Sequence, residues 1–268
     1  MLKNIFSGIS NFGYNLKKST MLNKHTPSEN RYAAYEYFKD KVTKAQKESD
    51  VDAFNETIQI FLARFAIAVS NSIKDDEEKN YIKDYLESLG QAVVEPIKQF
   101  IMKNSIIAYP IEILISIIGK DKTLDFLNTV LTTEDTLFDD PLVEKRIEIL
   151  KQFAGATHSD MLSKASIFLN DSDDRLVIAS IRFIRDYVFS DNEDMDKIAD
   201  AMAVKFVDPE TSARIRIELL NVFLEQEWKV SGVKKQFEEL LPEGYYINTQ
   251  GFVRVIQHAV TNLSSMKK

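Results

Sequence analysis

The sequence predicts an all-α fold made of successive amphipathic helices. Glycine and proline number only 8 and 6 among 268 residues, whereas average usage is about 7% and 5%. Both residues serve turns, so their scarcity argues against a loop-rich β fold. Apolar residues recur at helical spacing along most of the chain, and short polar connections separate these stretches. Together these patterns predict many helices joined by brief turns.

The first 25 residues differ from the rest of the chain. They contain four lysines and no acidic residue, since the first acid is Glu29. Apolar residues fall there at helical spacing: Leu2, Ile5, Phe6, Ile9, Phe12 and Leu16. We predict that residues 1–25 cap the open face of the first repeat, which repeat proteins need for solubility. A helix lying in a membrane surface is the alternative.

A break at residues 26–30 separates this segment from the main helical region, and Ser28 is the predicted N-cap after the break. Residues 29–241 are predicted to form the repeat domain. The expected helices are 29–47, 50–70, 75–89, 91–104, 107–118, 120–131, 140–154, 159–170, 174–189, 194–206, 208–226 and 231–241. Residues 242–256 read as a turn followed by a hairpin, and residues 257–268 as a tail.

The second half of the chain carries an internal repeat. Asp140, Asp174 and Asp208 are separated by 34 residues each, and each is expected to open a helix. A helix pair of this length cannot bury its apolar face alone, and stacking of neighbouring pairs buries it. Thirty-four residues is also the tetratricopeptide period, but the aromatic and glycine pattern of that family is missing.

Acid-led helices with mixed apolar and arginine positions resemble HEAT repeats, most plainly at residues 173–181 and 214–217. The order of the whole chain resembles a group of uncharacterised bacterial HEAT-repeat proteins of the armadillo type. The resemblance rests on Ser28-Glu29-Asn30-Arg31-Tyr32 near the start and on Leu241-Pro242-Glu243-Gly244-Tyr245-Tyr246 near the end. It implies a HEAT-like α-α superhelix, or solenoid, with a short C-terminal β-hairpin cap, and a scaffold role.

Composition excludes several classes of protein. No run of 18 apolar residues is present, so no transmembrane helix is expected. The amino terminus has no compact apolar signal core, which makes the cytoplasm the expected location. The chain has no cysteine and a net charge of −7, so disulfides are excluded and nucleic acid is an unfavoured partner.

No catalytic, cofactor-binding or metal site is predicted. Gly8 and Gly13 have the spacing of a phosphate-binding loop, but the lysine and hydroxyl residue that should follow are missing. The three histidines are scattered. Acidic clusters at residues 75–78, 171–174 and 191–196 lack the glycine of a calcium loop. We interpret them as acids at helix amino termini, facing the positive end of the helix dipole.

The arginines are the candidate partner-contact residues. Arg182 and Arg216 are 34 residues apart, and Arg146 and Arg214 are two such steps apart. An arginine fork suits carboxylates or phosphates. The full candidate set is Arg64, Arg146, Arg182, Arg185, Arg214 and Arg216. The favoured interpretation is a structural ladder in which each arginine bonds a turn aspartate of its neighbour; a recognition surface is the alternative.

The sequence therefore predicts a non-catalytic scaffold or adaptor whose partner is another protein. Two alternatives share a HEAT-like fold: a nucleic-acid module like the alkylpurine DNA glycosylases, and a chaperone like the phycobilin lyases. Trp228, the only tryptophan, is expected to pack beneath the carboxy-terminal hairpin. Residues 1–25 leave a membrane surface open as a further partner.

Overall fold

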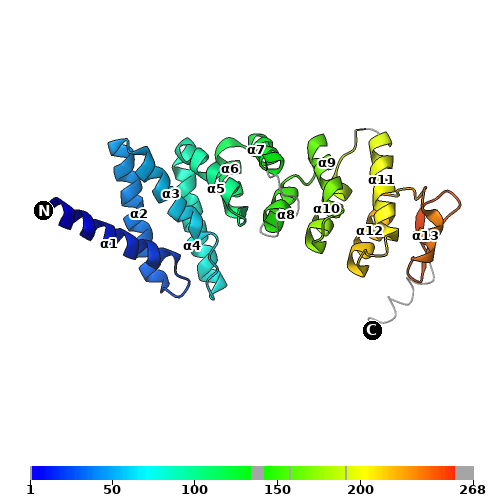
Figure 1. Ribbon diagram of the computed structural model, residues 1–268, viewed down its shortest axis with the longest axis horizontal. Coiled ribbons are helices and arrows are strands. Elements are labelled where there is room, and N and C mark those ends of the chain that lie inside the picture. Colours follow the sequence, from blue (N-terminus) through cyan, green and yellow to red (C-terminus); the bar gives the residue numbers. More distant parts are fainter. Residues whose placement is uncertain (1, 134–141, 157, 191, 257–268) are drawn as a thin grey trace. The chain divides into compact units, whose positions relative to one another are not determined.

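A computed structural model describes residues 2–133, 142–156, 158–190 and 192–256, with no account of the side chains of residues 2–11 and 132–133. The structure confirms a mostly helical fold with a small hairpin near the carboxy terminus (Figure 1). The chain divides into two compact units, residues 1–130 (unit 1) and residues 131–268 (unit 2). Each unit is described by itself.

Unit 1 holds helices that alternate between two layers. α2, α4 and α6 are successive neighbours in one layer, whereas α3 packs on α5 in the other; α2 also contacts α3, and α5 contacts α6. The elements are α1 (Leu2–Leu22), α2 (Ser28–Glu48), α3 (Val51–Arg64), α4 (Ser72–Ser88), the short 3-10 helix η1 (Gly90–Val93), α5 (Val94–Lys103), α6 (Ala108–Ile118) and α7 (Lys120–Thr133).

Local side chains set several of these helix ends. The Asp50 side chain accepts a hydrogen bond from the Ala53 N–H at 3.0 Å and so caps α3. The prediction that Ser28 is the N-cap of α2 is wrong. Ser28 is instead the first helical residue, and its hydroxyl donates to Glu78 at 2.6 Å. Pro27 precedes it, and its fixed φ of −58° suits an entry into the helix.

Helix α1 packs on α2 and α3, the position expected of a cap. Met21 is fully buried, and the Tyr14 ring meets the Phe38 ring edge-on at 5.5 Å. The predicted apolar stripe does not provide this packing where its side chains are described, because Phe12 is 71% exposed and Leu16 is 56% exposed. The side chains of the other four stripe members lie outside the described part of the chain.

Unit 2 places α10 between α8 and α12, so that these three helices form one row (Figure 1). α9 contacts α10, α11 contacts α12, and α13 contacts α11. The elements are α8 (Val143–Gln152), α9 (Ser159–Phe168), α10 (Asp174–Asp186), α11 (Asn192–Val207), α12 (Ala213–Glu225), α13 (Lys234–Glu239), β1 (Tyr245–Ile247) and β2 (Val253–Val255).

The predicted 34-residue step is wrong as a spacing of helix starts. Asp174 opens α10 as expected, but α12 begins at Ala213 with Ser212 as its N-cap. Asp208 instead organises the turn before α12, because its side chain accepts the Glu210 N–H at 3.0 Å. Asp140 lies outside the described residues. The start of α12 therefore lies 39 residues after the start of α10, not 34. The 34-residue period of the sequence does not fix where each helix begins.

The predicted hairpin is confirmed. β1 and β2 pair antiparallel with Tyr246 opposite Arg254, and the hairpin packs on α12 and α13. Gly251 closes it with a φ of +96°, a backbone conformation that favours glycine. Trp228 is buried, with its ring 5.7 Å from that of Phe189 and 6.2 Å from that of Phe223, so it packs in the core of unit 2. Packing of Trp228 beneath the hairpin stays a prediction.

No helix in the described ranges is long and apolar enough to cross a membrane.

Candidate functional site

The structure separates the six candidate arginines into buried and exposed groups. Arg64 is fully buried on α3, and its Nη2 lies 2.7 Å from Asp75 and 2.9 Å from Glu78. A side chain with no exposed surface cannot contact a partner, so the prediction of a recognition role for Arg64 is wrong. The physical reason is the proximity of two carboxylates, which offsets the cost of burying the charge.

Glu78 is the centre of this buried cluster. Its carboxylate accepts hydrogen bonds from Arg31 at 2.7 Å, Tyr35 at 2.7 Å and Ser28 at 2.6 Å, in addition to Arg64. Burial would raise the pKa of Glu78, but the donors around it outweigh burial and lower the pKa to about 2. The cluster ties α2, α3 and α4 together. Among the groups described there, the carboxylate oxygens are all engaged, which indicates a structural role.

This cluster also corrects the interpretation of the acidic residues 75–78. Asp75 and Glu78 are buried, whereas Asp76 and Glu77 are exposed. Only the exposed pair fits the prediction of solvated acids at a helix amino terminus. The buried pair serves the ion network because helical spacing of three residues places both on one face of α4.

Two further arginines are structural. Arg146 on α8 is buried, and its guanidinium lies 5.7 Å from the ring centroid of Phe168. Arg216 donates to the backbone carbonyls of Phe206 at 3.0 Å and Asp208 at 2.8 Å. It therefore caps the carboxy-terminal end of α11, where carbonyls lack helical partners. Burial thus withdraws Arg146 from the surface, and Arg216 is engaged by the end of α11.

The remaining three arginines come together in one groove over α8, α10 and α12. This arginine groove has a volume of about 440 Å³. It also includes Arg175, an arginine outside the six predicted candidates. The described lining is Glu144, Ile147, Leu150, Lys151, Ala154, Arg175, Ile178, Ala179, Arg182, Phe183, Arg185, Asp186 and Arg214.

Carboxylates of the same unit hold most of these arginines. Arg182 bridges α10 to α12 through Glu218 at 2.5 Å. Arg185 pairs with Asp186 at 2.8 Å, and Arg175 contacts both Asp173 and Glu144. The predicted ladder, in which each arginine bonds a turn aspartate of its neighbour, is not found among these pairs. Arg182 meets Glu218, which lies within a helix, and Arg185 meets Asp186 on its own helix. These ion pairs are exposed, and exposed pairs typically contribute only about 0–1 kcal/mol.

Arg214 differs from its neighbours. It is exposed in the first turn of α12, and within the described part of unit 2 no ion pair or hydrogen bond joins its side chain to another residue. Ile217, one helical turn further along α12, is 57% exposed. A guanidinium that lines the groove and an exposed aliphatic side chain are thus one turn apart on α12.

The floor of the arginine groove is apolar. Leu150, Ile178 and Phe183 are buried beneath it, and Ala179 is half-buried. Among the described lining residues there is no histidine, cysteine, serine, threonine or tyrosine to act as a nucleophile. An apolar floor with arginine walls binds by burial and by charge-assisted hydrogen bonds.

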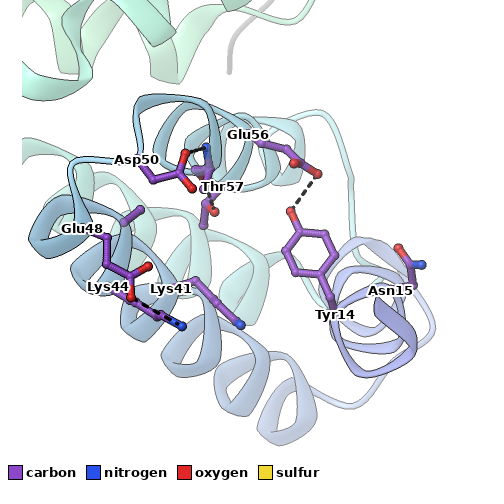
Figure 2. A pocket seen from close by; sticks show the side chains of 10 residues that line it. Tyr14, Asn15, Lys41, Lys44, Glu48, Asp50, Glu56 and Thr57 are labelled. Carbon is purple, nitrogen blue, oxygen red and sulfur yellow. Dashed lines mark hydrogen bonds and ion pairs between the residues drawn. The ribbon is translucent and has the colours of Figure 1, made fainter. Parts of the chain in front are cut away.

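A second hollow lies in unit 1 between α1, α2 and α3, with a volume of about 450 Å³. Figure 2 shows the Tyr14 side chain directed at Glu56, with Lys41 and Lys44 on the opposite wall. The Tyr14 hydroxyl donates to Glu56 Oε1 at 2.9 Å, and burial together with this hydrogen bond raises the pKa of Tyr14. The residues that line this hollow carry charges of both signs, namely Lys41, Lys44, Glu48, Asp50 and Glu56. The lining therefore favours no single class of charged ligand.

Throughout the described ranges, no three histidine, cysteine, aspartate or glutamate side chains gather as a metal site would require.

Comparison with protein families, with curated proteins and with solved structures finds no match to this chain. The resemblance to bacterial HEAT-repeat proteins therefore stays a prediction.

Proposed function

We propose that this chain is a non-catalytic scaffold of HEAT-like helical-repeat type that binds another protein through the arginine groove of unit 2. The observation that carries the proposal is the grouping of Arg182, Arg185 and Arg214 around an apolar floor. Repeat proteins use such surfaces between successive helices for protein binding. Arginine is enriched at protein interfaces, where its planar fork pairs with carboxylates.

The chemistry of the groove favours a peptide segment that alternates acidic and apolar side chains. Carboxylates would exchange with the weak surface pairs of Arg182 and Arg185, and would meet Arg214 without competition. An apolar side chain of the segment would cover Ala179 and Ile217. Each large apolar side chain buried in this way contributes about 1.5–3 kcal/mol before ordering costs.

Nucleic acid is the less favoured partner for this groove. Glu144 and Asp186 lie among the lining residues, and Glu218 pairs with Arg182 at its edge. A phosphate backbone binds to lysines and arginines that are not already paired with carboxylates. The affinity of a protein for nucleic acid depends on how many phosphates such cations neutralise. Interleaved acids would repel such a backbone, whereas they leave room for a peptide of mixed polarity.

The test is selection of binding peptides from a displayed random library on the full chain. We expect selected peptides to combine aspartate or glutamate with leucine, isoleucine or phenylalanine. Arg214→Glu should weaken their binding by about tenfold, the equivalent of 1.4 kcal/mol. Lys235→Glu is the matched control, because Lys235 is an exposed cation on α13 outside the groove.

Two results would overturn the proposal. One is selected peptides without acidic bias. The other is equal loss of binding in Arg214→Glu and Lys235→Glu, which would mean that overall charge, not the groove, holds the peptide.

A further inference from the structure

Helix α1 is held to unit 1 by one of its faces. Met21 is fully buried, the Tyr14 ring packs edge-on against Phe38, and the Tyr14 hydroxyl reaches Glu56 on α3. In Figure 1, α1 crosses α2 and its amino-terminal end extends past that helix. The helix is therefore anchored by its carboxy-terminal half.

The opposite face of the same half of α1 is apolar and exposed. Phe12 is 71% exposed and Leu16 is 56% exposed. At about 100° per residue these two lie roughly 40° apart, whereas Tyr14 and Met21 lie about 180–200° around the helix from Phe12. The sequence continues the spacing of Phe12 and Leu16 toward the amino terminus with Ile5 and Ile9. Packing and apolar exposure thus occupy opposite sides of α1, so the predicted cap and the membrane alternative do not compete for one face.

The charged residues of this half of α1 are of one sign. Lys17 and Lys18 lie on either side of the helix, about 120° and 140° around it from the middle of the Phe12–Leu16 face, and Lys24 is exposed after the helix ends. No acidic residue precedes Glu29 in the sequence. Lysine stems can lie along an apolar surface while their ammonium groups reach outward, so lysines on both flanks of α1 can extend toward an anionic surface in contact with Phe12 and Leu16.

We propose that the Phe12–Leu16 face of α1 binds the surface of an anionic lipid bilayer. Phe12 and Leu16 enter the boundary between headgroups and acyl chains, and the lysines contact the anionic headgroups, the arrangement of interfacial amphipathic helices. Charge complementarity favours a lipid surface over a protein partner. Residues 1–28 contain four lysines and no acidic residue, which matches a uniformly negative surface. This inference is independent of the arginine groove, which lies in the other unit.

The experiment is flotation of the full chain with vesicles of phosphatidylcholine alone and of phosphatidylcholine mixed with phosphatidylglycerol. The native chain should float with the anionic vesicles and not with the neutral ones. Raising the salt to about 0.5 M should release it, because screening shortens the range of the lysine charges to a few ångströms. Phe12→Ser with Leu16→Ser should weaken partitioning at least about tenfold, since each substitution removes one buried apolar side chain.

Two control variants keep the result specific. Ile73→Ser removes an equally exposed apolar residue of unit 1, 71% exposed on α4, and should float like the native chain. Arg214→Glu alters the groove and should also float, so failure of the groove and failure of lipid binding are told apart. Thermal unfolding should be the same for all variants, because the substituted side chains are exposed.

Three outcomes would overturn the proposal: no flotation of the native chain with anionic vesicles, equal flotation of the Phe12 and Leu16 double variant, and equal loss on Ile73→Ser. A native chain that stays unbound to vesicles but changes its oligomeric state when Phe12 and Leu16 are replaced would assign this face to a protein contact instead.

Discussion

Replacing Glu78 by glutamine should destabilise unit 1 strongly. Glu78 is fully buried and receives hydrogen bonds from Ser28, Arg31, Tyr35 and Arg64. Glutamine has nearly the same shape but carries no charge and offers one acceptor oxygen. Its NH₂ group would face donors, and the Arg31 and Arg64 guanidinium groups would lose their shared counter-ion. Breaking a buried pair in this way costs about 3–5 kcal/mol.

The lowered pKa of Glu78 follows from the same contacts and gives a similar magnitude. A fall from the ordinary value of 4.5 to about 2 corresponds to roughly 3 kcal/mol of preference for the charged form in the folded state. Because the folded pKa is the lower one, this stability is present above pH 4.5 and is lost as the pH falls toward 2. The glutamine variant has no such group, so its stability should change less over that range.

Urea unfolding followed by circular dichroism and by tryptophan fluorescence is the appropriate assay. Trp228 is the only tryptophan and belongs to unit 2, so its fluorescence reports that unit, whereas circular dichroism reports helices in both. Glu78→Gln should move the circular dichroism transition to lower urea. The control is Glu77→Gln, an exposed neighbour on the same helix that should stay within about 0.5 kcal/mol of the native chain. Equal stability of the two variants would refute the assignment of Glu78 as the centre of a stabilising network.

Two further predictions concern the hairpin and metal ions. Gly251→Ala should destabilise unit 2 by more than about 1 kcal/mol, because the residue has a φ of +96° and an added Cβ would lie 2.9 Å from Lys229 Cγ; Gly232→Ala, with open space around it, should be nearly neutral in the same fluorescence-monitored unfolding. Adding calcium or a chelator should leave the melting temperature unchanged. A bound ion at 100 times its Kd stabilises the folded state by about 2.7 kcal/mol. A rise of the melting temperature with calcium would therefore reveal a site among the acidic clusters.

Most helices could be predicted because their pattern is local. The predicted spans 29–47 and 159–170 correspond to α2 (Ser28–Glu48) and α9 (Ser159–Phe168), and the hairpin lies where its turn residues placed it. Apolar spacing and turn chemistry act within a few residues, so they can be read along the chain. Helix ends were less predictable. α3 ends at Arg64 and not near residue 70, and the Arg64 side chain donates to the Ile67 carbonyl just beyond the helix at 2.8 Å.

The candidate site was predicted less completely, for a different reason. Six arginines look alike in a sequence, yet Arg64 is buried beside Glu78 and Arg214 is exposed and unpaired within the described part of its unit. Whether an arginine is buried or paired depends on residues that are distant along the chain. Arg182 pairs with Glu218, 36 residues away, and Arg31 pairs with Glu78, 47 residues away. No local pattern carries that information.

The sequence by itself determined the helical class, the order of most elements, the closing hairpin and the basic, acid-free character of the amino terminus, because propensity, periodicity and turn chemistry are properties of neighbouring residues. Only the tertiary structure decided which charges are buried, that Arg175, Arg182, Arg185 and Arg214 share one groove, and that α1 turns Met21 inward and Phe12 outward. Those outcomes depend on which surfaces meet when helices pack, and burial and ion pairing are settled by contacts between segments that the chain holds far apart.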